Sequence, residues 1–193
     1  MIRRTPRREE GGTGITTTHI TRLTSTTTMD CIDQLLTRRT VRKYAKTPIP
    51  QDKIDKILEA GRQSPSAVNR QPWHFLLITD QNIKDRIGGG FFNRHIRTSA
   101  FTIVGAYITN DPITKRWGLT DTVIALQTMV IAAHLQGIGT CWIGDYNEVR
   151  LRETLNIPPT ASIAAIITFG YAHKVPGTRK KRALDTILHT NTW

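Results

Sequence analysis

Apolar positions from residue 29 onward follow two kinds of spacing. Helices are predicted where apolar residues recur every three or four positions, which occurs after Asp30, after Pro50, over 81–87, over 119–135 and after Asn147. Buried strands are predicted where apolar runs are continuous, over 73–79, 101–109 and 163–169. Because the order shows no regular βαβ repeat, we expect an α+β fold.

The predicted helix over 119–135 is the longest and the most apolar. One stripe consists of Leu119, Val123, Leu126, Val130 and Ala133, and further apolar residues extend around the other faces. A helix that is apolar nearly all round must be buried on several sides. In a chain of 193 residues this favours a subunit interface, so we expect a homodimer with a long buried interface helix.

Residues 1–28 differ from the rest of the chain. Ten of them are Thr, four Arg lie within the first eight positions, and no apolar period is sustained. We expect a disordered or dispensable tail over 1–28 and one domain over 29–193.

Charge and cysteine content narrow the class of protein. The net charge is +12, which favours anionic partners such as phosphorylated cofactors or nucleic acid. With only Cys31 and Cys141, neither a disulfide scaffold nor a Cys-x-x-Cys metal site is expected. No secretory signal or membrane-length apolar stretch is evident, so we expect a cytoplasmic protein without a membrane partner.

Four stretches could carry chemistry. The basic stretches 38–43 and 179–182 could grip a phosphate through forked arginine donors. The polar stretch 64–73 could contact a planar heterocycle, and the glycine-rich stretch 137–144 could bring a backbone N–H to a ring nitrogen. Each also has a purely structural interpretation: a solvated charge run, a capped helix end, or a helix stop followed by a buried strand.

Side-chain catalysis is not indicated. The chain has no Gly-x-Ser-x-Gly elbow, no P-loop and no Gly-x-Gly-x-x-Gly fingerprint, and its six histidines lack metal-ligand spacing. We therefore predict no catalytic side chain and no metal site. If the chain is an enzyme, a cofactor carries the chemistry.

In their order along the chain, these stretches resemble the FMN-dependent nitroreductase family. The resemblance rests on Arg-Arg-Thr-Val-Arg-Lys-Tyr at 38–44, Ser-Pro-Ser-Ala-Val-Asn-Arg-Gln-Pro-Trp-His-Phe at 64–75, Gly-Ile-Gly-Thr-Cys-Trp-Ile-Gly at 137–144 and the basic element ending at Arg182. It implies a compact homodimer with a central, mostly antiparallel sheet flanked by helices, and with FMN at the interface. It further implies that NADH or NADPH gives a hydride to flavin N5, and that electrons pass by a ping-pong mechanism to a nitroaromatic or quinone acceptor.

The resemblance also implies the residues of the site. For the phosphate and ribityl chain they are Arg38, Arg39, Thr40, Arg42, Lys180 and Arg182. For the isoalloxazine ring they are Asn93, the backbone of Ile143 and Gly144, and, from the partner chain, Pro65, Ser66, Ala67 and Asn69. The short segment between Gly88 and Ala100 indicates an open site, with candidate substrate-lining residues Phe91, Phe92, His95 and Trp117. Ala67 stands where some members have Ser, which removes one side-chain contact to the ring.

Three alternatives stay open from the sequence. One is the same fold and FMN used for dehalogenation, dehydrogenation or flavin breakdown, and another is a flavin-binding protein without turnover. The third is a basic nucleic-acid-binding protein. The charge supports it, but aromatic residues make up only 7% and no recognition motif is present, so no nucleic-acid partner is expected.

Overall fold

A single antiparallel sheet organises the protein. The computed structural model describes residues 30–90 and 93–193. Its strands lie in the order β1 (Trp73–Ile78), β2 (Phe101–Ile108), β4 (Ala161–Gly170) and β3 (Gly139–Ile143), and every neighbouring pair is antiparallel. The predicted strands correspond to β1, β2 and β4, and β3 lies within the glycine-rich stretch.

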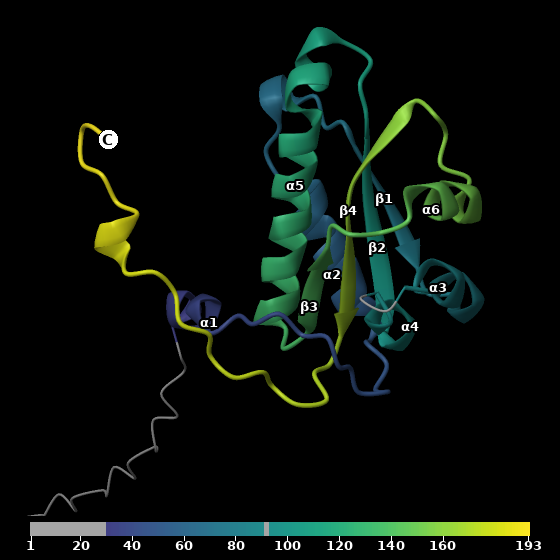
Figure 1. Ribbon diagram of the computed structural model, residues 1–193, viewed down its shortest axis with the longest axis horizontal. Helices are drawn as coiled ribbons and strands as arrows, with labels where there is room; N and C mark the ends of the chain where they lie inside the picture. The colour runs from purple at the N-terminus through teal and green to yellow at the C-terminus, as the bar shows by residue number, and fades with distance from the viewer. Residues whose placement is uncertain (1–29, 91–92) are drawn as a thin grey trace, which may run out of the picture.

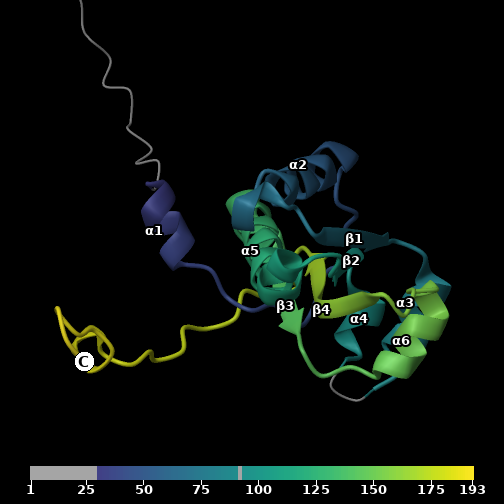
Figure 2. The same cartoon turned by 90° about the horizontal axis from the view of Figure 1, so that it is seen from above.

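Helices cover both faces of this sheet. α2 (Gln51–Arg62) and α5 (Pro112–Leu135) pack on one face, while α3 (Gln81–Ile87), α4 (His95–Thr98) and α6 (Glu148–Leu155) lie on the other (Figures 1 and 2). Along β2, Ile103 belongs to the core under α2 and α5, and the next residue, Val104, belongs to the core under α3, α4 and α6. Because successive side chains point to opposite faces, a strand covered on both sides is apolar throughout. The expected α+β fold with an antiparallel sheet is confirmed.

The long helix begins earlier than its apolar stripe predicts. α5 starts at Pro112, and the Asp111 side chain accepts hydrogen bonds from the backbone N–H groups of Ile113 (2.8 Å) and Thr114 (3.1 Å). This capping box and the proline at the first helical position are start signals that lie outside the stripe. By length and composition alone α5 could cross a membrane, so the expectation that no apolar stretch is long enough is wrong. Its buried side packs on the sheet and on α2.

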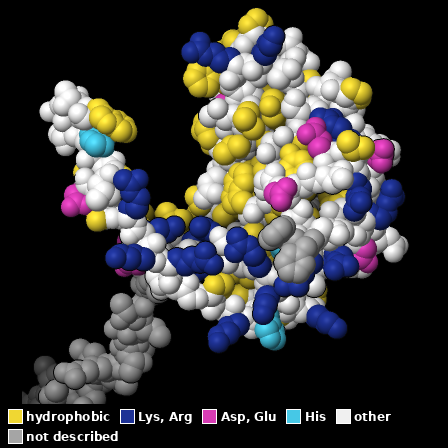
Figure 3. Space-filling view, in the orientation of Figure 1, with side chains coloured by type: hydrophobic (Ala, Val, Ile, Leu, Met, Phe, Trp, Pro, Cys, Tyr) yellow, Lys and Arg dark blue, Asp and Glu magenta, His cyan; other side chains and the backbone are white. Residues whose placement is uncertain are grey.

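Within one chain, α5 is buried on one side only. Leu126, Met129, Val130 and Ala133 have no solvent exposure, whereas apolar side chains elsewhere on the helix are between 37% and 48% exposed: Trp117, Leu119, Val123, Ile124 and Leu135. Figure 3 shows hydrophobic side chains gathered over this helix.

Both ends of the described chain project from the body. α1 (Cys31–Leu36) has no buried residue, and the segment after β4 runs away from the sheet to a short 3-10 turn, η2 (Leu184–Thr186) (Figures 1 and 2). Exposed apolar side chains occur on both: Ile32, Leu36, Val175, Leu184, Ile187, Leu188 and Trp193. The tail expected over 1–28 lies outside the described residues.

Candidate functional site

The first basic stretch, residues 38–43, crosses the end of the sheet where β3 begins and β4 ends. Thr40 forms a parallel bridge with Thr140, and the Val41 N–H donates to the Thr140 carbonyl at 2.9 Å. Tyr44 forms an antiparallel bridge with Ala172. The backbone of the stretch is therefore held by strand pairing at both ends, and its cationic side chains are carried on a rigid frame.

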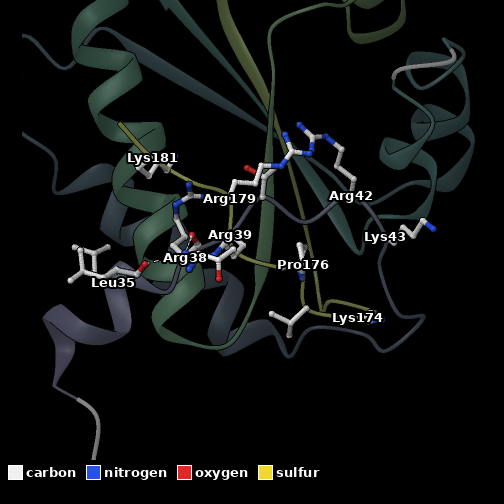
Figure 4. Close-up of a pocket in the computed structure, with 14 residues that line it drawn as sticks. Leu35, Arg38, Arg39, Arg42, Lys43, Lys174, Pro176, Arg179 and Lys181 are labelled. Atoms are coloured by element: carbon white, nitrogen blue, oxygen red, sulfur yellow. Dashed lines mark hydrogen bonds between the residues drawn. The ribbon is translucent and has the colours of Figure 1, made fainter. Parts of the chain in front are cut away.

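The chain that leaves β4 closes a cavity against this stretch, and we call it the basic cavity. Its volume is about 800 Å³. No carboxylate of the described residues lines it, but seven cationic side chains do: Arg38, Arg39, Arg42, Lys43, Lys174, Arg179 and Lys181 (Figure 4). Arg38, Arg39 and Arg179 lie together, as the close-up shows, and blue side chains mark this region in Figure 3. Like charges held this close repel one another until an anion enters, so the donor set suits a phosphate.

The second basic stretch enters the cavity with a register that differs from the expected one. Arg179 and Lys181 line the cavity, while the expected Lys180 and Arg182 are not among its lining residues. Arg182 Nη2 instead donates to the Thr186 carbonyl at 2.9 Å. Alternate side chains of an extended segment face opposite ways. A shift of one residue therefore brings Arg179 and Lys181 to the cavity in place of Lys180 and Arg182.

Neutral groups lie behind the cationic ones. The Tyr44 hydroxyl is 2.7 Å from Thr168 Oγ1, and burial raises the pKa of Tyr44 above its ordinary value. Burial also raises the pKa of the Cys141 thiol, against the opposing effect of the Arg42 guanidinium. Both groups stay uncharged at neutral pH, so neither supplies a counter-anion to the basic cavity.

Ile143 and Gly144 stand at the other end of β3. Ile143 is buried in the core under α6, whereas Gly144 is exposed and a Cβ built there would meet no atom within 4 Å. β3 is an edge strand, and within the described residues only the Thr40–Thr140 bridge occupies its outer edge. No side chain at Gly144 obstructs a ligand that approaches this edge.

The loop over 64–71 joins α2 to β1 and includes the 3-10 turn η1 (Ala67–Asn69). Val68, Asn69 and Gln71 have φ values of 51°, 54° and 49°, which is the left-handed region. Side chains within the loop support this path: Ser66 Oγ accepts from the Gln71 N–H at 2.9 Å, and Asn69 Oδ1 accepts from Gln71 Nε2 at 3.1 Å. The Ala67 N–H donates to both carboxylate oxygens of Asp121, on α5, at 3.2 Å.

The 64–71 loop and α1 contact α5 at different points along its length. The loop contacts Asp121, whereas α1, which leads into the basic stretch, reaches His134, whose Nε2 is 2.8 Å from the Gln34 carbonyl. Thirteen residues of helix between positions 121 and 134 correspond to about 20 Å. Within one chain, about 20 Å of helix therefore separates the contact of the 64–71 loop from the contact of α1.

The remaining expected residues have several different settings. Asn93 is 9% exposed and its Nδ2 donates to the Asp145 carbonyl at 2.6 Å, so it fixes the turn that follows Gly144. His95 is buried in α4, and Trp117 is exposed on the first half of α5. Neither lines the basic cavity. Phe91 and Phe92 lie outside the described residues. In the described part of the chain, no group of three or more His, Cys, Asp or Glu side chains could hold a metal ion.

Sequence reasoning missed several residues at these places. Lys174 lies outside both basic stretches, and its positive charge was the available signal. Lys43, Arg179 and Lys181 lie within the stretches that could grip a phosphate but were not named as individual site residues. Asp121 was missed as well. Its signal was an isolated acidic residue within the most apolar helix, which is rare unless the carboxylate has a partner.

Comparisons with known proteins identify the family. The model of the nitroreductase family matches residues 35–95 and 88–171. This chain belongs to the nitroreductase family. A protein of Methanothermobacter thermautotrophicus, named provisionally as an NADH dehydrogenase/NAD(P)H nitroreductase, is 31% identical over 86% of this chain and 88% of its own length. The FMN reductase [NAD(P)H] of Bacillus subtilis is 26% identical over 85% of this chain and 74% of its own.

Solved structures of the family share the fold. A crystal structure from Parabacteroides distasonis, with the same provisional name, covers 84% of this chain and 98% of its own at a TM-score of 0.76 and 28% identity. The NADPH:FMN oxidoreductase of Vibrio harveyi covers 84% of this chain and 77% of its own at a TM-score of 0.78 and 19% identity. The expected family, enzyme class and cofactors are confirmed: the protein is an NAD(P)H-dependent flavin oxidoreductase that uses FMN.

Proposed function

We propose that two copies of this chain, in the cytoplasm, form two FMN sites and reduce a small nitroaromatic or quinone acceptor by a ping-pong mechanism. Each site would combine the basic cavity and the β3 edge of one chain with the 64–71 loop of the other. The observation that carries the proposal is the basic cavity, with its seven cations and no carboxylate among the described lining residues. When bound there, FMN supplies a ring that accepts a hydride from NADH or NADPH and passes electrons to the acceptor.

The donor set of the basic cavity fits an FMN phosphate. Arg38, Arg39 and Arg179 lie together in Figure 4 and offer guanidinium donors to a dianion, and Thr40 also lines the cavity. Arg39 Nη1 already donates to the carbonyls of Leu36 and Arg38, which leaves its other N–H groups for the phosphate. Hydrogen bonds to charged groups each contribute about 1.5–3 kcal/mol. Arg42 would serve the ribityl chain. The cavity favours Arg179 and Lys181 over Lys180 and Arg182 as the donors from the C-terminal segment.

The β3 edge fits the polar side of the flavin ring. The backbone N–H groups of Ile143 and Gly144 would face it, because no side chain at Gly144 obstructs the approach. Donors at this position favour extra electron density on the ring, since they act on charge that appears on reduction. Asn93 would contribute by holding the following turn through Asp145.

Two surfaces support a second copy of the chain. The exposed apolar residues of α5 form a face on a helix that is otherwise core, and α1 and the C-terminal segment carry further exposed apolar side chains. Burying such side chains stabilises by roughly 25 cal/mol per Å². The separation along α5 is a second reason, because the 64–71 loop contacts the helix at Asp121, about 20 Å along it from His134, which α1 contacts. We therefore assign residues 29–193 to one FMN-binding domain. Its two projecting ends, α1 and the C-terminal segment, would contact the partner chain.

The first test is the visible absorption spectrum of the purified protein, recorded before and after anaerobic addition of NADPH and then NADH. We expect flavin bands that bleach with at least one donor. A panel of nitroaromatics, quinones and halogenated phenols then ranks acceptors, and parallel double-reciprocal plots are expected for a ping-pong mechanism. Halogenated phenols belong in the panel because a 50-residue segment is 38% identical to the iodotyrosine deiodinase of Haliscomenobacter hydrossis. Absence of flavin bands after soaking with FMN would reject the proposal, and DNA binding would then be the next assay.

A mixing experiment tests whether each site is shared between chains. A chain with Arg38→Ala lacks the phosphate grip, and a chain with Asn69→Ala lacks a ring contact. In a heterodimer of the two, one site carries both defects and the other carries neither. We expect FMN binding and activity to recover on mixing, to about half the normal value per heterodimer. Mixing without recovery, with heterodimers shown to form, would place both groups in the same chain's site.

A further inference from the structure

Asp121 is a buried carboxylate in the middle of the apolar helix α5. It is 4% exposed, and Thr122 and Ala125 beside it are fully buried. No Lys, Arg or His of the described residues forms an ion pair with it; its hydrogen-bond partner is the Ala67 N–H, which both oxygens share at 3.2 Å. Burying a carboxylate without a cation is costly. The hydrogen bond to the Ala67 N–H is therefore the contact that offsets the cost of burying this carboxylate.

The partner belongs to a strained loop. Val68, the residue after Ala67, has φ 51° and ψ 30°, a conformation that β-branched residues strongly disfavour. Its side chain is 76% exposed, so packing does not hold it there. Strained backbone of this kind persists only where surrounding contacts over-determine it.

Few contacts within the described residues are available to hold this strain. One is the Ser66 Oγ bond to the Gln71 N–H, which lies within the loop itself. Another is an exposed ion pair between Arg70 and Asp111 at 3.8 Å, a type of contact that contributes little. The Asp121 carboxylate is the buried contact that ties the loop to α5. A charged acceptor in apolar surroundings makes a stronger bond than a neutral one.

We propose that Asp121 is a positioning residue for flavin binding. Its carboxylate holds the Ala67 amide, and thereby holds the left-handed turn that presents Ser66 and Asn69 to the flavin. Asp121 acts through the backbone of Ala67 and does not touch the flavin. This inference rests on the proposed FMN site, because it assumes that the 64–71 loop contacts the ring.

The test compares three variants of the full-length protein. Asp121→Ala removes both acceptor oxygens, and Asp121→Asn keeps one of them without the charge. Thr122→Val is the matched control, because it removes a buried hydroxyl from the adjacent position whose bond, at 2.7 Å, goes to the Gly118 carbonyl of the same helix. Each variant is measured for Tm, for the Kd of FMN by flavin fluorescence, and for hydrogen–deuterium exchange of the peptide covering 64–71.

The two Asp121 variants are expected to differ from the control in a specific way. Asp121→Ala should raise the Kd of FMN by about tenfold or more and speed exchange in the loop, because a hydrogen bond to a charged group is lost. Asp121→Asn should raise the Kd less, and it remains informative if the alanine variant does not fold. Thr122→Val should lower the Tm while it leaves the Kd within about twofold of the wild type.

A second substitution tests the mechanism of strain. Glycine adopts a positive φ without steric cost, so Val68→Gly in the Asp121→Ala background should recover part of the lost FMN affinity. Val68→Ala keeps a Cβ and should recover less. Equal recovery by both would overturn the strain argument.

The outcomes separate this inference from the proposed function. If the wild type binds FMN and Asp121→Ala lowers the Tm without changing the Kd, Asp121 is merely structural and the positioning role is rejected. If the wild type binds no FMN, the proposed function itself fails, and the role of Asp121 in flavin binding fails with it. A raised Kd with faster loop exchange, absent from Thr122→Val, supports the proposal.

Discussion

The basic cavity and the 64–71 loop hold their candidate ligand-binding groups in opposite ways. Seven long cationic side chains line the cavity, and the four within 38–43 stand on a backbone fixed by bridges at Thr40 and Tyr44. The loop presents short polar groups on a backbone forced into the left-handed region and tied to a buried carboxylate. Ligand binding by the cavity would depend on side-chain charge, whereas binding by the loop would depend on backbone conformation.

This difference predicts how each region responds to change. Charges that act on one phosphate are partly interchangeable, so a loss in the cavity should weaken binding by degrees and without unfolding. A strained backbone has no such redundancy, and a change there shifts conformation and stability together. The following predictions test that contrast.

The largest effect is expected at Arg38. Arg38→Ala should raise the Kd of FMN by about 10- to 100-fold, because a forked, charge-assisted contact is lost. The Tm of the apoprotein should change little, since Arg38 belongs to neither core. Isothermal titration with FMN and thermal denaturation measure the two quantities. Arg38→Lys, which keeps the charge without the fork, should lie between; an unchanged Kd in both variants would remove Arg38 from the phosphate site.

The register of the C-terminal segment predicts a smaller, alternating effect. Arg179→Gln and Lys181→Gln should each raise the Kd of FMN by about tenfold, because these side chains line the cavity. Lys180→Gln and Arg182→Gln should change it by less than about twofold. All four variants remove one charge, so they control for net charge. The reverse pattern would restore Lys180 and Arg182, the donors that the family motif implies.

A substitution at Tyr44 tests the backbone that carries the cationic side chains of 38–43. Tyr44→Phe should lower the free energy of unfolding by about 1 kcal/mol, because the hydrogen bond to Thr168 Oγ1 is lost. Burial raises the pKa of Tyr44 in the folded protein, so the unfolded chain ionises first, near pH 10. The contribution of the tyrosine to stability is therefore complete below about pH 10 and declines as pH rises above it. Urea denaturation between about pH 8 and 11, which brackets the ordinary pKa of tyrosine, should show a shallower decline for Tyr44→Phe. Parallel declines would contradict the assignment.

The smallest effect is expected at Val68 in the otherwise unaltered chain. Val68→Gly should raise the free energy of unfolding by about 0.5 kcal/mol, because relief of the left-handed strain exceeds the added entropy of glycine in the unfolded chain. Val68→Ala retains a Cβ and serves as the control. Urea denaturation measures both, and destabilisation by glycine would show that the turn is held without strain.

Much of the fold was predictable because local patterns and tertiary packing agree. β1, β2 and β4 appear as continuous apolar runs since both faces of the sheet are covered. β3 was ambiguous, because a five-residue strand flanked by glycines also resembles a binding loop. The start of α5 at Pro112 was missed because its first turns leave the apolar stripe, although Asp111 and Pro112 carried a start signal.

The candidate site was predictable to a lesser extent. Arg38, Arg39 and Arg42 were found from residue type and motif, and the structure brings them into one cavity. The choice between Arg179 and Lys180 depends on which way an extended segment faces, and one residue of register reverses it. Asp121 and Ala67 lie 54 positions apart, so no local pattern predicts their contact.

The amino-acid sequence by itself determined most helices and strands, the basic character and the family, because each depends on residue types at short spacing. Tertiary structure decided which cations share a cavity, which carboxylate contacts the 64–71 loop, and where along α5 that loop and α1 pack. Those properties depend on contacts between residues distant in sequence, whose geometry is set by packing of the whole sheet. The 64–71 loop shows the same division: Val68 strongly disfavours the left-handed region locally, and the fold holds it there at φ 51°.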